Sequence, residues 1–229
     1  MVATAERRGA LVVRPIAALF RHPVAVAASK LSLADHELYP DELAHIQAAV
    51  PKRRAEFATA RLLARQALAT LGAAPMSLVP APDRAPVWPL GFTGSISHCT
   101  DYCAVVVARS GDLRSLGLDV EDLRVIEPMM LDLVLTDGER RWLRAQPESL
   151  QPTLPILIFS AKEAYYKCQY PITSGFLEFR DVELMIDWAA GTFEARVLKA
   201  GWPTVVARRP GRFVIDAERV YCGVELAQG

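Results

Sequence analysis

The sequence predicts an α+β fold in which two similar halves, residues 1–115 and 116–229, meet near Gly117. Each half combines long segments that have the apolar spacing of helices with short segments rich in β-branched residues. Glycine and proline turns separate the strands of the second half closely enough to indicate antiparallel pairing. The chain has 229 residues, which is enough for one large core or two small ones.

The first half is predicted to contain one long helix, from about Lys52 to Leu71. Its apolar residues recur at three- and four-residue steps, and Pro51 before it and Gly72 after it are typical helix boundaries. Because seven residues make nearly two turns, several arginines gather on its surface: Arg54, Arg61 and Arg65, with Arg53 beside them. They form either a solvated face or a set of guanidinium groups suited to phosphate.

An irregular, proline-rich stretch follows and leads to the sequence G-S-I-S-H-C at residues 94–99. A turn at Thr100-Asp101 then precedes a buried strand from Tyr102 to Ala108. His98 therefore lies just before a buried strand. It is either a satisfied structural histidine or, as a cation or an N–H donor, a ligand for phosphate.

The second half is predicted to begin with a short strand, Gly117 to Glu121, followed by two helices. Thr136 and Glu139 match a capping box at the start of a helix that ends near Arg144. The next helix is expected from Thr153, a candidate N-cap, to Cys168, because Pro171 comes just after it. Further strands are expected around turns at Gly191 and Pro210-Gly211: Val182–Trp188, Thr192–Leu198, Thr204–Ala207, Arg212–Ala217 and Val220–Leu226.

The composition disfavours several classes of protein. The charges balance to a net of zero, which disfavours a generally basic nucleic-acid binder. The four cysteines have no metal-binding spacing, and we expect reduced, buried thiols. The first apolar run, residues 10–20, is broken by Arg14 and Pro15 and is too short to span a membrane. We therefore expect a cytoplasmic protein.

Asp119 and Glu121 are expected on one face of their strand, about 7 Å apart, with the alternating Leu118 and Val120 facing the core. At an effective dielectric constant of about 20, two such carboxylates repel each other by roughly 2–3 kcal/mol, and a divalent cation reverses that sign. Magnesium takes one or two carboxylates together with phosphate oxygens and water. The alternative is a solvated strand edge whose acids pair with Arg114 or Arg124.

The segment F-S-A-K-E-A-Y-Y-K, Phe159 to Lys167, places Glu163 between two lysines on a predicted helix. Gathered in space with Asp119 and Glu121, Glu163 would complete a site for a hard cation, and the lysines suit a phosphate. The alternative is an ion pair between Glu163 and Lys167, four residues apart on one helix face. That alternative does not explain why the charges follow the apolar run I-L-I-F directly, an arrangement typical of a cleft rim.

Five elements follow one another along the chain: K-R-R-A-E-F-x-x-x-R, D-R-A-P-V-W-P, G-S-I-S-H-C, G-L-D-V-E and F-S-A-K-E-A-Y-Y-K. Together they resemble the 4'-phosphopantetheinyl transferases of the large single-chain type, which activate siderophore, surfactin and related synthases, and most closely the enterobactin-synthase branch. The motifs span Lys52 to Lys167, over half the chain. Phe159 stands where many relatives have tryptophan, and Leu118 where isoleucine or valine is usual, but both changes keep an apolar side chain.

The resemblance implies a magnesium-dependent enzyme that moves the phosphopantetheine arm of coenzyme A onto a serine of an apo acyl or peptidyl carrier protein and releases 3',5'-ADP. It also implies a monomer with coenzyme A in the crevice between the two α+β halves. The magnesium ligands would be Asp119, Glu121 and Glu163, with Glu163 also acting as general base. Lys162 and Lys167 would contact the pyrophosphate and act in catalysis, and the remaining contacts to coenzyme A would come from a set of polar residues: Arg53, Arg61, Arg84, Ser97 and His98.

Two other functions remain open: a magnesium-dependent nuclease, which the neutral charge disfavours, and a non-catalytic module that binds coenzyme A or a carrier protein. Neither nucleic acid nor a membrane is expected as a partner. The sequence does not specify the carrier or its pathway. Tyr165, Tyr166 and the segment after Lys167 are candidates for docking it, because they lie close to the expected site.

Overall fold

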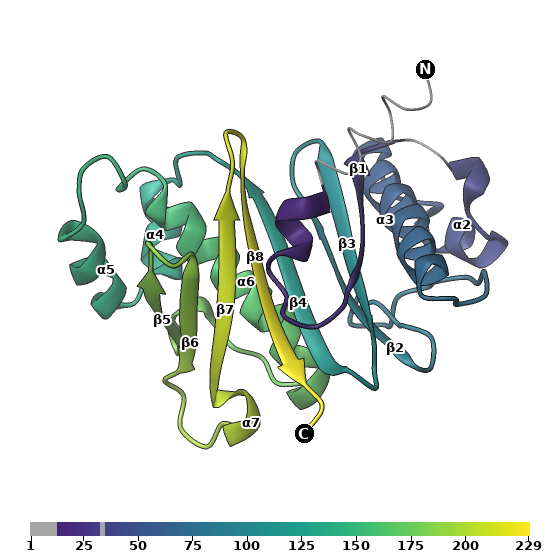
Figure 1. The fold of residues 1–229 in the computed structure, drawn as a ribbon. Helices are drawn as coiled ribbons and strands as arrows, with labels where there is room; N and C mark the ends of the chain where they lie inside the picture. The colour runs from purple at the N-terminus through teal and green to yellow at the C-terminus, as the bar shows by residue number, and fades with distance from the viewer. Residues whose placement is uncertain (1–12, 33–34) are drawn as a thin grey trace. The chain divides into compact units, whose positions relative to one another are not determined.

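The computed structural model describes residues 13–32 and 35–229. The chain divides into two compact units, unit 1 with Met1–Arg114 and Ala227–Gly229 and unit 2 with Ser115–Leu226. The predicted α+β class is confirmed, since each unit combines helices with antiparallel strands (Figure 1). The start of the apolar run at 10–20 lies outside the described residues. Within the described ranges, no helix is long and apolar enough to cross a membrane.

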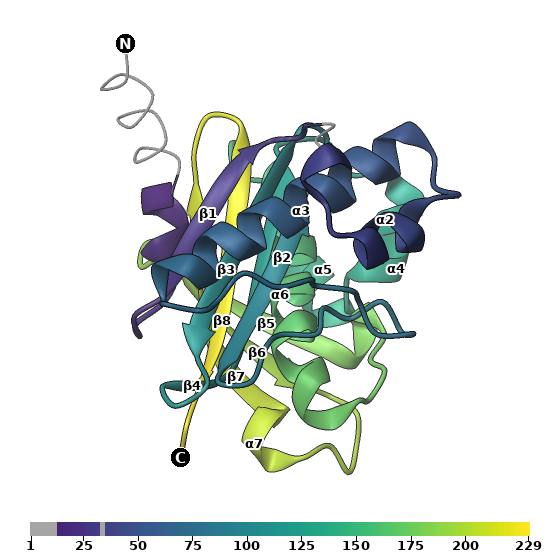
Figure 2. The ribbon, with the colours of Figure 1, turned by 90° about the vertical axis from the view of Figure 1, so that its right-hand side faces the viewer.

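Unit 1 contains a three-stranded antiparallel sheet and a long helix packed against it. The sheet order is β1 (Ala25–Lys30), β3 (Tyr102–Arg109), β2 (Phe92–His98). Helix α3 (Pro51–Thr70) contacts β1 and β3, and Figure 2 shows it running across this sheet. The predicted helix and the predicted buried strand are therefore confirmed. Strand β2, of which His98 is the last residue, was not predicted.

The remaining parts of unit 1 lie beside α3. The short helices η1 (Asp35–Glu37) and α2 (Pro40–Ile46) contact it, and residues 71–91 after it form no helix or strand, as their prolines predict. This irregular stretch is fixed at Leu78. The Leu78 amide donates to Glu42 Oε1 at 2.8 Å, and its carbonyl accepts from Nε of Arg61 at 2.5 Å.

Unit 2 contains a five-stranded sheet in the order β4 (Leu113–Asp122), β8 (Arg219–Ala227), β7 (Arg208–Ile215), β6 (Thr192–Val197), β5 (Val182–Asp187). Two sequence predictions for this sheet are wrong. Residues Thr204–Ala207 form the short helix α7 instead of a strand, with Pro203 at its N-cap position. Pro210 and Gly211 lie inside β7 instead of in a turn, because Gly211 is needed there for packing: a Cβ on it would lie 2.2 Å from the Phe193 ring on the paired strand.

Helix α6 (Leu154–Thr173) packs against this sheet, and the core of unit 2 lies between them (Figure 1). The helix is longer than predicted, because Pro171 lies inside its last turn. A proline there removes one hydrogen bond, to the carbonyl four residues earlier, and the helix continues to a left-handed cap at Ser174. Thr153 occupies the N-cap position, but its side chain makes no capping bond, contrary to the prediction.

Two short helices, α4 (Pro128–Val134) and α5 (Asp137–Arg144), connect β4 to α6 along the chain. The predicted capping box of α5 is confirmed. The Thr136 hydroxyl accepts from the amide of Glu139 at 3.1 Å, and the Glu139 carboxylate accepts from the amide of Thr136 at 2.8 Å. The 3-10 helix η2 (Phe179–Asp181) leads into β5.

Candidate active site

Strand β4 carries the first two candidate acids next to a buried apolar pair. Leu118 and Val120 are 0% exposed, as the alternation predicts. Asp119 is also buried, at 3%, whereas Glu121 is half-buried. A solvated strand edge is therefore excluded for Asp119. The Glu121 carboxylate lies 3.5 Å from Arg124, one of the two arginines named in that alternative.

Gly117 brings this strand against helix α6. A Cβ on Gly117 would lie 1.9 Å from the carbonyl oxygen of Ala164 and 2.7 Å from the amide nitrogen of Cys168. Real Cβ contacts are never this short, so only glycine allows the two backbones to approach this closely. The motif G-L-D-V-E thus contains both the contact with the helix and, two residues later, Asp119.

Lys167 connects the helix to the strand. Its ammonium group lies 2.7 Å from Oδ1 of Asp119, and the side chains are 26% and 4% exposed. The alternative, in which Lys167 pairs only with Glu163 on the same helix, therefore leaves out its partner Asp119 on β4. Its charge also acts on Glu163, where it partly offsets a rise in pKa that burial causes and that Asp119 increases. Asp119, Glu163 and Lys167 thus form one electrostatic group.

Glu121 belongs to the same group. Burial, followed by the charge of Asp119, raises its pKa to about 7, while Arg124 and Lys167 act in the opposite direction. Burial and the charge of Asp119 thus disfavour the ionised forms of Glu121 and Glu163, and a divalent cation beside these carboxylates would offset that effect. In the described ranges no three acidic, histidine or cysteine side chains form a complete metal-binding cluster. Magnesium does not require one, since phosphate oxygens and water complete its shell.

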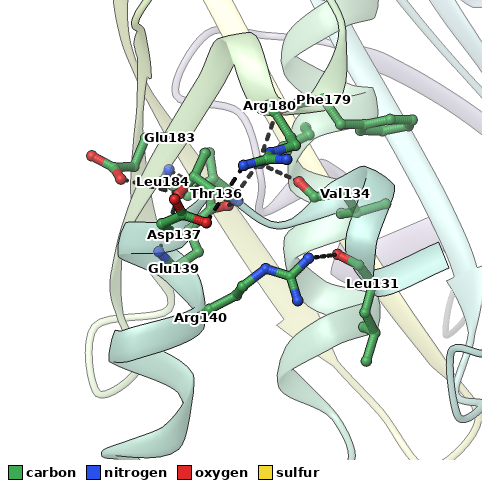
Figure 3. Close-up of polar contacts among 11 residues, drawn as sticks. Leu131, Val134, Thr136, Asp137, Glu139, Arg140, Phe179, Arg180, Glu183 and Leu184 are labelled. Carbon is green, nitrogen blue, oxygen red and sulfur yellow. Dashed lines mark hydrogen bonds and ion pairs between the residues drawn. The ribbon is translucent and has the colours of Figure 1, made fainter. Parts of the chain in front are cut away.

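Lys162 does not join this group, and the prediction that it contacts pyrophosphate needs correction. Its side chain is 2% exposed, and its ammonium lies 2.7 Å from Oε2 of Glu139. It also donates to the carbonyls of Val134 at 2.8 Å and Phe179 at 2.9 Å. An ammonium has three N–H groups, and these three acceptors use all of them. Figure 3 shows the acceptor residues converging from α4, α5 and η2.

The predicted docking role of Tyr165 is also wrong. Tyr165 is 0% exposed, and its hydroxyl donates to the carbonyl of Val206 at 2.8 Å, so it is a core residue. Tyr166 is partly exposed and stacks on Tyr170, with ring centroids 5.5 Å apart. Phe176, beyond the end of α6, lies edge-on to Tyr166 and is 68% exposed.

In unit 1, the candidate cations divide into two sets. Arg61 and Arg65 are not a solvated face. Arg61 is 6% exposed, with its guanidinium over the Phe57 ring, and burial lowers its pKa to about 10. Arg65 pairs at 2.8 Å with the buried carboxylate of Glu42.

The other set is grouped around Glu56. Its Oε2 lies 3.3 Å from Nη1 of Arg53 and 3.8 Å from Nε2 of His98. Ser97 is buried at the end of the same strand as His98. Arg84 belongs to neither set. It is an exposed residue of the irregular stretch and has φ 71°, which is unusual for a residue other than glycine.

Two residues of these sites, Glu56 and Glu139, were not predicted as such from the sequence. Glu56 is the one acid in K-R-R-A-E-F, and an acid among cations is a signal that could have identified it. Glu139 was identified as a helix cap, but nothing local in the sequence indicates that its partner is Lys162, 23 residues later.

Comparison with known proteins identifies the family. Residues 41–108 match the family model described as the 4'-phosphopantetheinyl transferase N-terminal domain, and residues 115–217 match that of the 4'-phosphopantetheinyl transferase superfamily. The 4'-phosphopantetheinyl transferase Svp of Streptomyces mobaraensis is 44% identical over 75% of this chain and 70% of its own length. The chain belongs to the 4'-phosphopantetheinyl transferase superfamily.

Two further relatives extend this similarity. PptT of Mycobacterium tuberculosis is 36% identical over 71% of this chain and 73% of its own length. Enterobactin synthase component D of Escherichia coli is 31% identical over 66% of this chain and 70% of its own length. The superfamily match spans β4 and α6, the two elements that carry Asp119, Glu121, Glu163 and Lys167.

Proposed function

We propose that this chain transfers the 4'-phosphopantetheine arm of coenzyme A to a serine of an apo acyl or peptidyl carrier protein and releases 3',5'-ADP. The observation that carries the proposal is the group on β4 and α6: the Asp119–Lys167 ion pair at 2.7 Å with Glu163 in electrostatic contact. Svp and PptT, two of the relatives named above, are 4'-phosphopantetheinyl transferases, which supports the same reaction.

Magnesium is the proposed cofactor, held by Asp119, Glu121 and Glu163. The fit rests on the donor set. Burial and the charge of Asp119 raise the pKa of Glu121 and Glu163 and so disfavour their ionised forms, an effect that a divalent cation would offset. When bound, the ion would neutralise charge on the pyrophosphate as the bond to the leaving group breaks.

The chain's own residues would act on the carrier serine and the leaving group. The serine Oγ forms a bond to the phosphorus that bears the pantetheine arm, the bond from that phosphorus to the bridging oxygen breaks, and Glu163 accepts the serine proton. Burial raises the pKa of Glu163, which makes it a stronger base than an exposed carboxylate. Lys167, at the same point of the fold, would stabilise the charge that develops on 3',5'-ADP.

Coenzyme A phosphates would be held by residues of unit 1. His98 and Arg53 are the best placed of these, because both side chains lie near the one carboxylate of Glu56. Arg61 would act mainly by fixing residue 78 and the irregular stretch that carries Arg84. Ser97 would orient the phosphate beside His98. We also propose that the enzyme is monomeric and cytoplasmic, since its four cysteines have no spacing typical of a disulfide framework.

Intact-protein mass spectrometry tests the proposed reaction. An apo carrier protein is incubated with the enzyme, coenzyme A and magnesium, with and without chelator. We expect a magnesium-dependent gain of one phosphopantetheine on the carrier serine. No gain on fatty-acid, polyketide or peptide carriers, with coenzyme A still bound, would instead identify a non-catalytic binding module.

A further inference from the structure

Glu163, the candidate base, has a structural constraint on each side along α6. The residue before it, Lys162, is tied by its side chain to α4, α5 and η2. The residue after it, Ala164, presents its carbonyl to Gly117 of β4 with no room for a Cβ between them. The contact at Ala164 sets how close α6 comes to the strand. It does not by itself prevent the helix from turning about its own axis.

The Lys162 cluster supplies that second constraint. Successive residues on a helix point about 100° apart, so a side chain fixed at one residue sets the direction of the next. The Lys162 ammonium is held by three acceptors at 2.7, 2.8 and 2.9 Å, which come from three different elements. Rotation of α6 would break these bonds in a site from which water is excluded.

Glu139 is the centre of this cluster. It is 2% exposed, and its carboxylate accepts hydrogen bonds from three different parts of unit 2. Oε2 accepts from the Thr136 amide and from Lys162, and Oε1 accepts from the amide of Leu184 on β5 at 2.8 Å. A capping box needs only the first of these bonds, so the role of Glu139 extends beyond ending a helix (Figure 3).

Stability alone is a weak explanation for such a pair. Taking two charges out of water offsets most of their attraction, and buried ion pairs replaced by apolar residues often leave stability unchanged or higher. Apolar side chains, however, make contacts that do not depend on direction, whereas hydrogen bonds do. A lysine held by three acceptors fixes one orientation, whereas packed methyl groups permit several.

We propose that the buried Glu139–Lys162 pair is a positioning device, which fixes the rotation of α6 so that Glu163 faces Asp119 and the substrate. The inference rests on the proposed transfer function and deepens it. Neither residue touches substrate in this account. Both act through Glu163, and Glu139 becomes a functional residue although it lies outside the motifs on which the family resemblance rests.

The test uses the full-length protein with Lys162→Met, Glu139→Gln and the double variant. The double variant removes both charges and keeps an amide oxygen as acceptor for Thr136 or Leu184. We expect each variant, corrected for its folded fraction by circular dichroism, to show a kcat for transfer at least about tenfold below wild type, as loss of a residue that orients a ligand commonly gives. The KM for coenzyme A should stay within about twofold of wild type, because unit 1 is unchanged.

A second readout needs no turnover. Manganese binding, followed by electron paramagnetic resonance, should weaken by about tenfold in Lys162→Met if Glu163 is misdirected. Lys162→Arg keeps the cation and should give a kcat between those of the wild type and Lys162→Met. Arg180→Gln is the matched control. It breaks the exposed Asp137–Arg180 pair at 3.4 Å, which also joins α5 to η2, and should leave kcat and manganese affinity unchanged.

The outcomes separate the two proposals. A wild-type protein that transfers no phosphopantetheine overturns both. If the wild type is active and the variants keep its kcat and its manganese affinity, only the positioning role is overturned. If neither Lys162→Arg nor Glu139→Gln yields folded protein, the pair is a requirement of the fold and the positioning role is also overturned.

Discussion

Gly117 and Ala164 meet backbone to backbone, so closely that a Cβ on the glycine would lie 1.9 Å from the alanine carbonyl oxygen. The contact joins β4 to α6 at the residues beside both candidate acids, Asp119 two positions along the strand and Glu163 one position back on the helix. Geometry at the site therefore depends on a residue that has no side chain.

Gly117→Ala should destabilise the protein severely. The added methyl group meets main-chain atoms, which cannot rotate away, so we expect a loss of about 3 kcal/mol or more in the free energy of unfolding. Urea denaturation measures it. Gly111→Ala is the control, because a Cβ there meets nothing within 4 Å and the free energy should change little. Equal effects at the two glycines would contradict the close contact.

Glu163→Gln and Asp119→Ala should each abolish phosphopantetheine transfer while the protein stays folded. The first removes the proton acceptor, and the second removes a proposed magnesium ligand and the partner of Lys167. Transfer is followed by carrier mass and folding by circular dichroism. Glu148→Gln, at an exposed position, should behave as wild type. Retained turnover in either site variant would remove that residue from its proposed role.

His98→Ala should raise the KM for coenzyme A and leave kcat nearly unchanged, because the residue is proposed to hold a phosphate distant from the reacting atoms. Steady-state kinetics with varied coenzyme A measures both constants. His36→Ala is the matched control, since His36 is an exposed histidine of the same unit. A lowered kcat at constant KM would place His98 in the chemical step instead.

Arg61→Ala should lower both the melting temperature and the affinity for coenzyme A. Its Nε bond to the Leu78 carbonyl and its packing over Phe57 are lost, at a cost of about 1–3 kcal/mol. Differential scanning calorimetry and coenzyme A titration give the two effects. An unchanged melting temperature would mean that Arg61 does not hold the irregular stretch.

Thiol alkylation of the folded protein at about pH 8.5 should label Cys99 well before the other cysteines. Burial raises the pKa of Cys168 from its ordinary value of 9.0 to about 12, and burial also raises that of Cys222. A raised thiol pKa means that the folded state holds its proton more tightly. The contribution of the Cys168 thiol to stability is therefore complete below pH 9 and is lost as the pH rises towards 12. Peptide mapping identifies the labelled residues, and early labelling of Cys168 would contradict this.

Apolar periodicity was sufficient to predict α3, α6 and the buried strand β3, because burial repeats along each of them. Periodicity failed to predict the local structure where a residue packs against a side chain on another strand. Pro210-Gly211 has the composition of a turn, but the Phe193 ring packs over Gly211 within the sheet. The extension of α6 through Pro171 was missed for a related reason, since tertiary packing outweighs one missing hydrogen bond.

In the candidate site, too, some residues could be predicted from the sequence and others only from the folded structure. The motifs identified Asp119, Glu163 and Lys167, which the structure brings together. The family resemblance implied a contact of Lys162 with pyrophosphate, but neighbouring helical residues point in different directions, and the Lys162 side chain enters the interior. Only the folded chain reveals that its partner is Glu139.

Glu139 also limits how this enzyme can be recombined with its relatives. Residues 123–153, which hold α4 and α5, look like a connection that could be exchanged freely between β4 and α6. An exchange that omits a carboxylate at the third helical position of α5 would leave the Lys162 ammonium buried without its counter-ion. A chimaera should therefore inherit this segment and the start of F-S-A-K-E-A-Y-Y-K from the same parent.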